Sequence, residues 1–210
     1  MKIMLLNGSP HINGCTHEAL QVMSEVFKNE NFETEEFYIG TEPISPCKSC
    51  FSCAKIKKCV TDDKVNSFIK KMENCDALII ASPVHYASAS GIITTFLDRA
   101  FFVSYMGKDV FSHKPAAAIV NARRAGTTAT FDQLNKYFTI SQMPIISGRY
   151  WNMTHGVEPS EIYEDKEGIQ NLQIVARNMI YFLKCQEIGK KYGIYPPKIT
   201  EKIEVTNFIR

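Results

Sequence analysis

Short apolar runs alternate with stretches of helical periodicity along most of this chain. The apolar runs lie at 1–6, 76–86, 114–122 and 143–147, and the segment "FETEEFYI" at 32–39 is interpreted as a further strand. Helical spacing follows them at 18–28, from Asp62 or Asp63 to Glu73, up to about Phe102, at 126–141 and at 165–192. Five such alternations predict an α/β domain with a doubly wound, five-stranded parallel sheet and right-handed crossovers.

The length of 210 residues suits one such domain with a local excursion. We expect residues 1–192 to form the domain, with a cysteine-rich loop at 43–61 after the second strand. Pro196 and Pro197 cannot continue the last helix, so residues 193–210 are predicted to form an extended tail over the domain or a partner.

The overall composition is that of an ordinary globular protein, with 45% hydrophobic and 22% charged residues. A net charge of +2 gives no argument for binding to nucleic acid or to a membrane surface. The first apolar run reaches "NGSP" too early for a secretory signal and suits a buried strand. We therefore expect a cytoplasmic protein with reduced thiols and no membrane or nucleic-acid partner.

Four of the seven cysteines lie close together in the segment "PCKSCFSCAKIKKC". Their spacing, C-x2-C-x2-C-x5-C, comprises Cys47, Cys50, Cys53 and Cys59. In a reducing compartment this pattern suits an iron–sulfur cluster, a structural zinc ion, a redox disulfide relay or a loop of unliganded thiols. Zinc is less favoured, because structural zinc sites usually draw cysteine pairs from two separated knuckles. Interspersed lysines would offset the negative charge of a cluster.

The loop "NGSPHINGCTHEA" joins the first strand to the first helix. Its hydroxyls, glycines and helix N-terminal amides form the pattern of an anion site at the carboxyl end of a strand. The lysine of a nucleoside-triphosphate loop is missing, and so is the G-x-G-x-x-G dinucleotide fingerprint. A monophosphate therefore fits better, although Ser9 and Thr16 could simply cap the helix.

Two further loops follow the third and fourth predicted strands. In "SPVHYASASG", Pro83 fixes the backbone direction, and the rings of His85 and Tyr86 are followed by small residues. A planar ligand could therefore lie along this stretch of backbone. In the alternative interpretation, in which this segment binds no ligand, Tyr86 is a core aromatic residue and His85 is a surface residue. In "VNARRAGTTATFD", Arg123 and Arg124 could approach a polar ring edge or could belong to a solvated loop.

Three motifs in this order, "NGSPHINGCT", "SPVHYASASG…FLDR" and "ISGRYWNMTHG", resemble those of the flavodoxin-like NAD(P)H-dependent FMN reductases. The iron–sulfur flavoprotein branch is the most similar, and the resemblance covers residues 1–192. It implies a flavodoxin-like sheet of order 2-1-3-4-5, bound FMN and a [4Fe–4S] cluster on the four clustered cysteines.

The resemblance also implies which residues bind FMN. The phosphate would be held by Ser9, His11, Asn13, Gly14, Cys15 and Thr16, the ring by Pro83, Val84, His85, Tyr86 and Ser88, and its polar edge by Asn121, Ala122, Arg123 and Gly126. This chain departs from the family at His11, where arginine or lysine is common, and at Cys15, where asparagine is common. Both changes weaken side-chain contacts to a phosphate and leave the backbone amides in place.

The implied function is an FMN-dependent oxidoreductase that moves electrons between NAD(P)H or ferredoxin and a small-molecule or protein acceptor. Alternatives are an NAD(P)H-dependent quinone or FMN reductase without a cluster, a flavodoxin-like carrier and a zinc-stapled interaction module. Carriers usually present a strongly acidic face, which a net charge of +2 does not favour. Tyr86 and His85 are candidate proton donors, no catalytic residue stands out, and the resemblance implies a homodimer or homotetramer.

Overall fold

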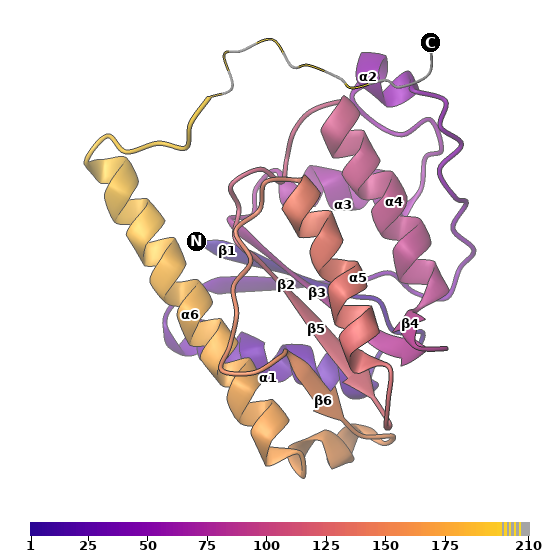
Figure 1. Ribbon diagram of the computed structural model, residues 1–210, viewed down its shortest axis with the longest axis vertical. Helices are drawn as coiled ribbons and strands as arrows, with labels where there is room; N and C mark the ends of the chain where they lie inside the picture. Colours follow the sequence, from indigo (N-terminus) through magenta and orange to yellow (C-terminus); the bar gives the residue numbers. More distant parts are fainter. Residues whose placement is uncertain (199, 201, 203, 205, 207–210) are drawn as a thin grey trace.

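A computed structural model describes residues 1–198, 200, 202, 204 and 206. Strands and helices alternate as predicted (Figure 1). The elements are β1 Lys2–Asn7, α1 Cys15–Asn29, β2 Glu33–Tyr38, α2 Ser52–Ile56, α3 Lys64–Met72, β3 Ala77–His85, β4 Ser88–Ala89, α4 Gly91–Met106, β5 Ala116–Ala122, α5 Thr127–Ile140, β6 Met153–His155, a 3-10 turn Pro159–Tyr163 and α6 Lys166–Lys191.

The parallel strands lie in the order β2-β1-β3-β5-β6, and the short β4 pairs antiparallel with β3. Counted without β4, this is the expected order 2-1-3-4-5, so the flavodoxin-like, doubly wound fold is confirmed. The chain runs outward in opposite directions from β1 and β3, and ligands of such sheets bind beyond the carboxyl ends of strands at this switch point.

Helices cover both faces of the sheet, and each face has its own apolar core. Residues of α1 and α6 form one core, and residues of α3, α4 and α5 form the other. Strand β3 supplies both cores by alternation: Leu78 and Ile80 face α3 and α4, while Ile79 and Ala81 face α1 and α6. Burial on both sides explains why this strand is an almost continuous apolar run.

The position predicted for the fifth strand, 143–147, is wrong. Only an isolated bridge between Ala116 and Ile145 forms there, and the fifth parallel strand is β6, which pairs with the end of β5. Between them, the Asn171 side chain of α6 accepts from the amides of Arg149 and Tyr150, at 2.9 and 3.0 Å. A side chain thus replaces the neighbouring strand, which an apolar pattern cannot reveal.

The cysteine-rich excursion between β2 and α3 contains the short helix α2, which the sequence pattern did not predict. Ser49, Phe51 and Lys57 have positive φ angles of 50°, 57° and 59°. The loop packs on α4, where the Phe51 and Phe102 ring centroids lie 5.6 Å apart. Left-handed non-glycine residues are strained, so tertiary packing must hold this loop in its conformation.

The last helix ends where the sequence predicted, but a glycine rather than the proline pair ends it. Gly193 has a φ of 80°, and the Ile194 amide donates to the Gly189 carbonyl at 2.8 Å, as in a Schellman motif. The predicted tail at 193–210 lies partly outside the described residues and stays a prediction. No helix in the described part of the chain is long and apolar enough to cross a membrane.

Candidate functional site

The loop between β1 and α1 is fixed by a buried amide. Asn7, the last residue of β1, is fully buried. Its Oδ1 accepts from the Ser9 amide at 3.0 Å, and its Nδ2 donates to Glu36 at 2.8 Å. The Ser9 hydroxyl in turn accepts from the His11 amide at 3.1 Å. These bonds preform the turn that the sequence analysis assigned to a phosphate.

The N-terminus of α1 is open to an anion. Gly14 occupies the N-cap position and no side chain caps this terminus, so the first amides of α1 have no side-chain acceptor. Ser9 and Thr16 are buried beside it. A Cβ at Gly8 would lie 2.3 Å from Ile93 Cδ1, so the loop approaches α4 too closely for a side chain at this position. A phosphate fits this combination of amides, dipole and hydroxyls.

Among the described residues, the side chains of three predicted phosphate residues form no hydrogen bond within the turn. The Cys15 thiol donates to the Val157 carbonyl at 3.3 Å, and burial raises the pKa of this thiol, which is therefore neutral. His11 and Asn13 are exposed. Cys15 would therefore meet a phosphate through its backbone amide, which fits the departure from asparagine at this position.

The predicted ring segment forms a strained hairpin between β3 and β4. Val84 pairs with Ala89 and His85 with Ser88, which leaves Tyr86 and Ala87 as the turn. Their φ angles are 49° and 58°, values that two-residue hairpin turns usually give to glycine, asparagine or aspartate. Tyr86 is fully exposed and is not a core aromatic. Such strain is typical of ligand sites that the surroundings hold in place.

Two side chains that sequence reasoning missed fix this hairpin. Gln133 of α5 accepts from the Ser88 hydroxyl at 2.7 Å and from the Ala89 amide at 3.0 Å. The Ser90 hydroxyl donates to the Gly8 carbonyl at 2.8 Å. The hairpin is therefore joined both to α5 and to the phosphate loop. No sequence signal links Gln133 to a hairpin 45 residues away.

The third predicted loop, after β5, lies against the same hairpin. Gly126 has a φ of 90°, and a Cβ there would lie 2.7 Å from Ala87 Cα and 2.8 Å from Val84 Cγ1. Ala122 is buried and Arg123 is exposed beside it. The Asn121 side chain donates to Thr154 Oγ1 at 3.1 Å, so it joins β5 to β6. Pro83 and Ser88 are half-buried in the hairpin strands.

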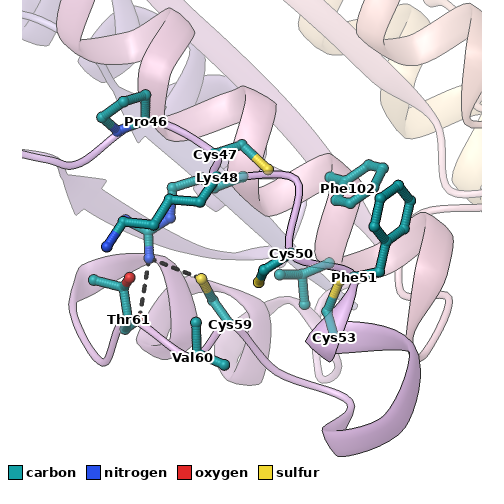
Figure 2. Close-up of a pocket in the computed structure, with 12 residues that line it drawn as sticks. Pro46, Cys47, Lys48, Cys50, Phe51, Cys53, Cys59, Val60, Thr61 and Phe102 are labelled. Carbon is teal, nitrogen blue, oxygen red and sulfur yellow. Dashed lines mark hydrogen bonds between the residues drawn. The ribbon is translucent and has the colours of Figure 1, made fainter.

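The four clustered cysteines form a second site beside α4. All four line one cavity, with Arg99, Phe102 and Val103 of α4 on its wall (Figure 2). Within the part of the chain that the structure describes, no three Cys, His, Asp or Glu side chains are gathered as closely as ligands of a bound metal. The four thiols that line this cavity nevertheless have the chemistry of a four-thiolate site.

The cysteines differ in their electrostatic surroundings. Burial raises the pKa of the Cys53 thiol, and the neighbouring Cys50 and Cys47 add to this effect. Hydrogen bonds from the amide and hydroxyl of Ser52 lower the pKa of the exposed Cys50 thiol, and the charge of Lys48 contributes. The loop itself therefore already stabilises one of its four thiolates.

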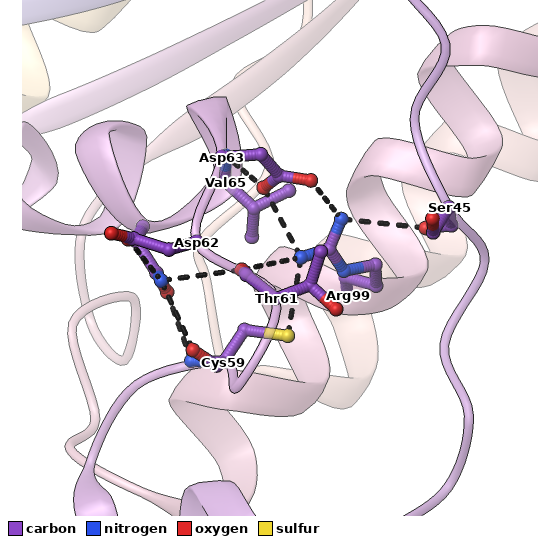
Figure 3. Close-up of polar contacts among 8 residues, drawn as sticks. Ser45, Cys59, Thr61, Asp62, Asp63, Val65 and Arg99 are labelled. Carbon is purple, nitrogen blue, oxygen red and sulfur yellow. Dashed lines mark hydrogen bonds and ion pairs between the residues drawn. The ribbon is translucent and has the colours of Figure 1, made fainter.

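The buried Arg99 of α4, part of the "FLDR" motif, holds the end of this loop. The Arg99 guanidinium donates to Cys59 Sγ at 3.1 Å and, through two nitrogens, to Asp63 at 2.5 and 3.1 Å (Figure 3). Asp63 also caps α3, since it accepts from the Val65 amide at 3.0 Å. A lone arginine in an apolar helix pattern is the signal that could have indicated this role.

The fold and the site at the switch point define a flavodoxin-like class of protein. The solved structure of an archaeal flavodoxin has a TM-score of 0.58 to this chain at 11% identity, and the match covers 88% of this chain and 99% of that one. Residues 1–158 match the NADPH-dependent FMN reductase family. The chain belongs to this family and is a flavoprotein oxidoreductase.

Curated relatives confirm the resemblance to iron–sulfur flavoproteins. The iron-sulfur flavoprotein of Methanosarcina thermophila is 27% identical over 186 residues, which cover 85% of this chain and 93% of the relative. An iron-sulfur flavoprotein of Methanocaldococcus jannaschii is 26% identical over 194 residues, which cover 88% and 98%. Both matches span most of the domain and are not confined to one motif.

Proposed function

We propose that this chain is an FMN-dependent oxidoreductase whose loop at 43–61 holds a [4Fe–4S] cluster. The ligands would be Cys47, Cys50, Cys53 and Cys59. The observation that carries this proposal is that all four thiols line one cavity, although they are spread over thirteen residues that include three in the left-handed region. Relatives named as iron-sulfur flavoproteins support it.

Each part of the chain has a definite task in this proposal. Bound FMN would exchange electrons singly or in pairs, and a cluster would exchange them one at a time. The amides of α1, with Ser9 and Thr16, hold the phosphate, and the hairpin backbone from Val84 to Ala87 orients the ring. Arg123, exposed in the loop after β5, would supply a cation to the polar ring edge. His85 and Tyr86, exposed on the hairpin, would hold a proton there.

The family supports a nicotinamide as electron donor. We propose NAD(P)H as the two-electron donor, ferredoxin as an alternative donor, and a small molecule or a one-electron protein as acceptor. The hairpin adjoins the start of α4, and the cysteine loop packs on its later turns. Because α4 keeps the two sites apart within one chain, we also propose a homodimer or homotetramer in which sites of neighbouring subunits approach each other.

The test is anaerobic purification followed by a visible spectrum and by analysis of FMN, iron, sulfide and zinc. We expect one FMN per chain, with iron and sulfide in equal amounts and in fourfold excess over FMN, as the cluster formula requires. Protein that carries FMN but only zinc, or four free thiols and no metal, would overturn the cluster and leave the flavin enzyme standing.

A second candidate is an NAD(P)H-dependent quinone or flavin reductase that uses no cluster. It is favoured by the match of residues 1–158 to the NADPH-dependent FMN reductase family, a description that names no cluster. The discriminating variant replaces all four cysteines by serine. If that variant oxidises NAD(P)H with a quinone as fast as the wild type, this second reading holds for small acceptors.

A further inference from the structure

Arg99 is a buried cation in the middle of the apolar helix α4. Its side chain is only 2% exposed, and it lies among residues that pack into the core. A buried guanidinium is costly unless its donors are paired, and Asp63 already supplies a carboxylate in a two-pronged arrangement. The Nη2 nitrogen, which also bonds Asp63, nevertheless lies within hydrogen-bond distance of the Cys59 sulfur, a contact that a purely structural ion pair does not need.

The contacts of this one guanidinium reach both ends of the cysteine loop. On the incoming side, Nη1 donates to the Ser45 carbonyl at 3.3 Å. On the outgoing side, Nη2 donates to Cys59 Sγ at 3.1 Å and to the Thr61 carbonyl at 3.0 Å. Figure 3 shows these contacts converging on the arginine from separate segments. Arg99 therefore fixes the separation of the loop ends and the direction of the Cys59 side chain.

Asp63 pairs with the guanidinium. It is anchored as the cap of α3 and accepts from Arg99 through two nitrogens, while the Ser45 and Thr61 carbonyls hold the guanidinium independently of this ion pair. The chain Val65–Asp63–Arg99–Cys59 links the start of α3 to the last cysteine of the motif. Partners outside the ligand set orient ligands and tune the metal in many sites.

We propose that Arg99 is the positioning residue of the cysteine site: it presets Cys59 as the fourth ligand and donates a charged N–H group to its sulfur. The inference rests on the proposed function, because it assumes that the four thiols hold an iron–sulfur cluster. A cationic donor to a ligand sulfur stabilises the more negative, reduced cluster and so raises its reduction potential. It also favours closure of the loop.

The experiment compares three variants with the wild type after anaerobic iron–sulfur reconstitution. Arg99→Gln removes the positive charge, and Arg99→Lys keeps the charge without the planar guanidinium and its several donors. Asp63→Asn keeps the contact to Cys59 and the acceptor that caps α3 but removes the ion pair. The readouts are iron and sulfide per FMN, the midpoint of reduction in a titration followed by electron paramagnetic resonance, and urea unfolding of the metal-free protein.

We expect Arg99→Gln to retain less than half of the wild-type iron. In the remaining cluster, the reduction equilibrium should shift about tenfold toward the oxidised state, which corresponds to about 59 mV for one electron. Arg99→Lys should recover part of this shift. Asp63→Asn should unfold at a lower urea concentration than the wild type. Its reduction equilibrium should stay within about twofold of the wild-type value.

Several results would overturn the inference. One is an Arg99→Gln protein with wild-type iron and potential; another is an Asp63→Asn protein whose potential shifts as far, which would assign Arg99 a structural role only. If Arg99→Gln does not fold, the Arg99→Lys variant becomes the test. An Arg99→Lys protein with unchanged iron content and unchanged potential would then overturn the inference. Wild-type protein that binds FMN but no iron would refute the cluster itself, an outcome separate from these.

Discussion

Two regions of the molecule differ in how their conformations are held: the proposed flavin edge, which comprises the turn at 7–16 and the hairpin at 83–90, and the cysteine loop at 43–61. At the flavin edge, the groups that would face a ligand are backbone amides at strand ends and at the start of α1, placed by regular elements. In the cysteine loop, the conformation depends on long-range side-chain contacts, above all that between Arg99 and Cys59, 40 residues apart. The first site therefore depends mainly on backbone that the fold places, with side-chain support from Asn7 and Gln133, and the second depends mainly on one buried cation.

The two regions also lie toward different ends of one helix. Helix α4 has 16 residues, about 24 Å of length, with the hairpin at its start and α2 near its other end (Figure 1). Both use non-glycine residues in the left-handed region: Tyr86 and Ala87 in one, Ser49, Phe51 and Lys57 in the other. Each region should therefore fail separately when its own support is removed.

The largest effect is expected for Asp63→Ala. This change leaves the Arg99 charge buried and unpaired, and it removes the cap of α3. Loss of one partner of a buried pair costs about 3–5 kcal/mol, and the lower end applies because the Asp63 side chain is 26% exposed. Urea unfolding of the metal-free protein measures the loss, and FMN affinity should not change.

The neighbouring carboxylate provides the control for this prediction. Asp62 bonds only to the side chain of Asn66, at 3.1 Å on the surface, so Asp62→Ala should change the free energy of unfolding by less than about 0.5 kcal/mol. If Asp63→Ala costs no more than Asp62→Ala, the guanidinium is not held as the contacts indicate. If it weakens FMN binding tenfold, the two regions are coupled.

The second effect tests the flavin edge through Gly8→Ala. The added Cβ would lie 2.3 Å from Ile93 Cδ1, so either the loop or α4 must move. Overpacking of this kind costs about 1–3 kcal/mol. We expect FMN affinity, followed by flavin fluorescence, to fall about tenfold or more, because the amides of the phosphate turn would be displaced.

Gly91→Ala is the matched control for Gly8→Ala. Gly91 is the first residue of α4, and an added Cβ there would meet nothing within 4 Å. The substitution should leave FMN affinity unchanged and stabilise the protein slightly, by up to about 1 kcal/mol, because it restricts the unfolded chain. Equal loss of FMN affinity in both variants would remove the argument from close packing.

The contrast between the regions also explains how much the sequence could predict. Strands, helices, the phosphate turn and the cysteine set follow from local patterns and short spacings, and a resemblance to known motifs adds FMN. The sequence could not place β6, because the segment before it, at Arg149 and Tyr150, is bonded by the Asn171 side chain and not by a strand. A lone cation in an apolar helix could have drawn attention to Arg99, but its partners and those of Gln133 are distant in sequence, so no local pattern could name them.

The third effect is smaller and concerns the hairpin support. Gln133→Ala removes the acceptor for the Ser88 hydroxyl and the Ala89 amide. Both donors can turn to water in part, so we expect a loss of about 1 kcal/mol and about a threefold to fivefold weaker FMN affinity. Gln133→Glu keeps the accepting oxygen and should restore most of both. If the two variants behave alike, the hydrogen bonds do not position the hairpin.

The smallest effect concerns the pH dependence of stability at the flavin edge. Burial raises the pKa of the Cys15 thiol in the folded protein above that of the unfolded chain, about 8.5. The unfolded state therefore releases this proton first, so the stabilising contribution is complete below about pH 8 and is lost as pH rises toward the folded pKa. Between pH 8 and 9.5, the free energy of unfolding should therefore fall more steeply with pH in the wild type than in Cys15→Ala, whose other titrating groups are the same. Urea unfolding at several pH values gives the two slopes. Parallel slopes would mean that the thiol bonded to Val157 is as solvated in the folded state as in the unfolded one, and that the phosphate turn is less closed than its contacts indicate.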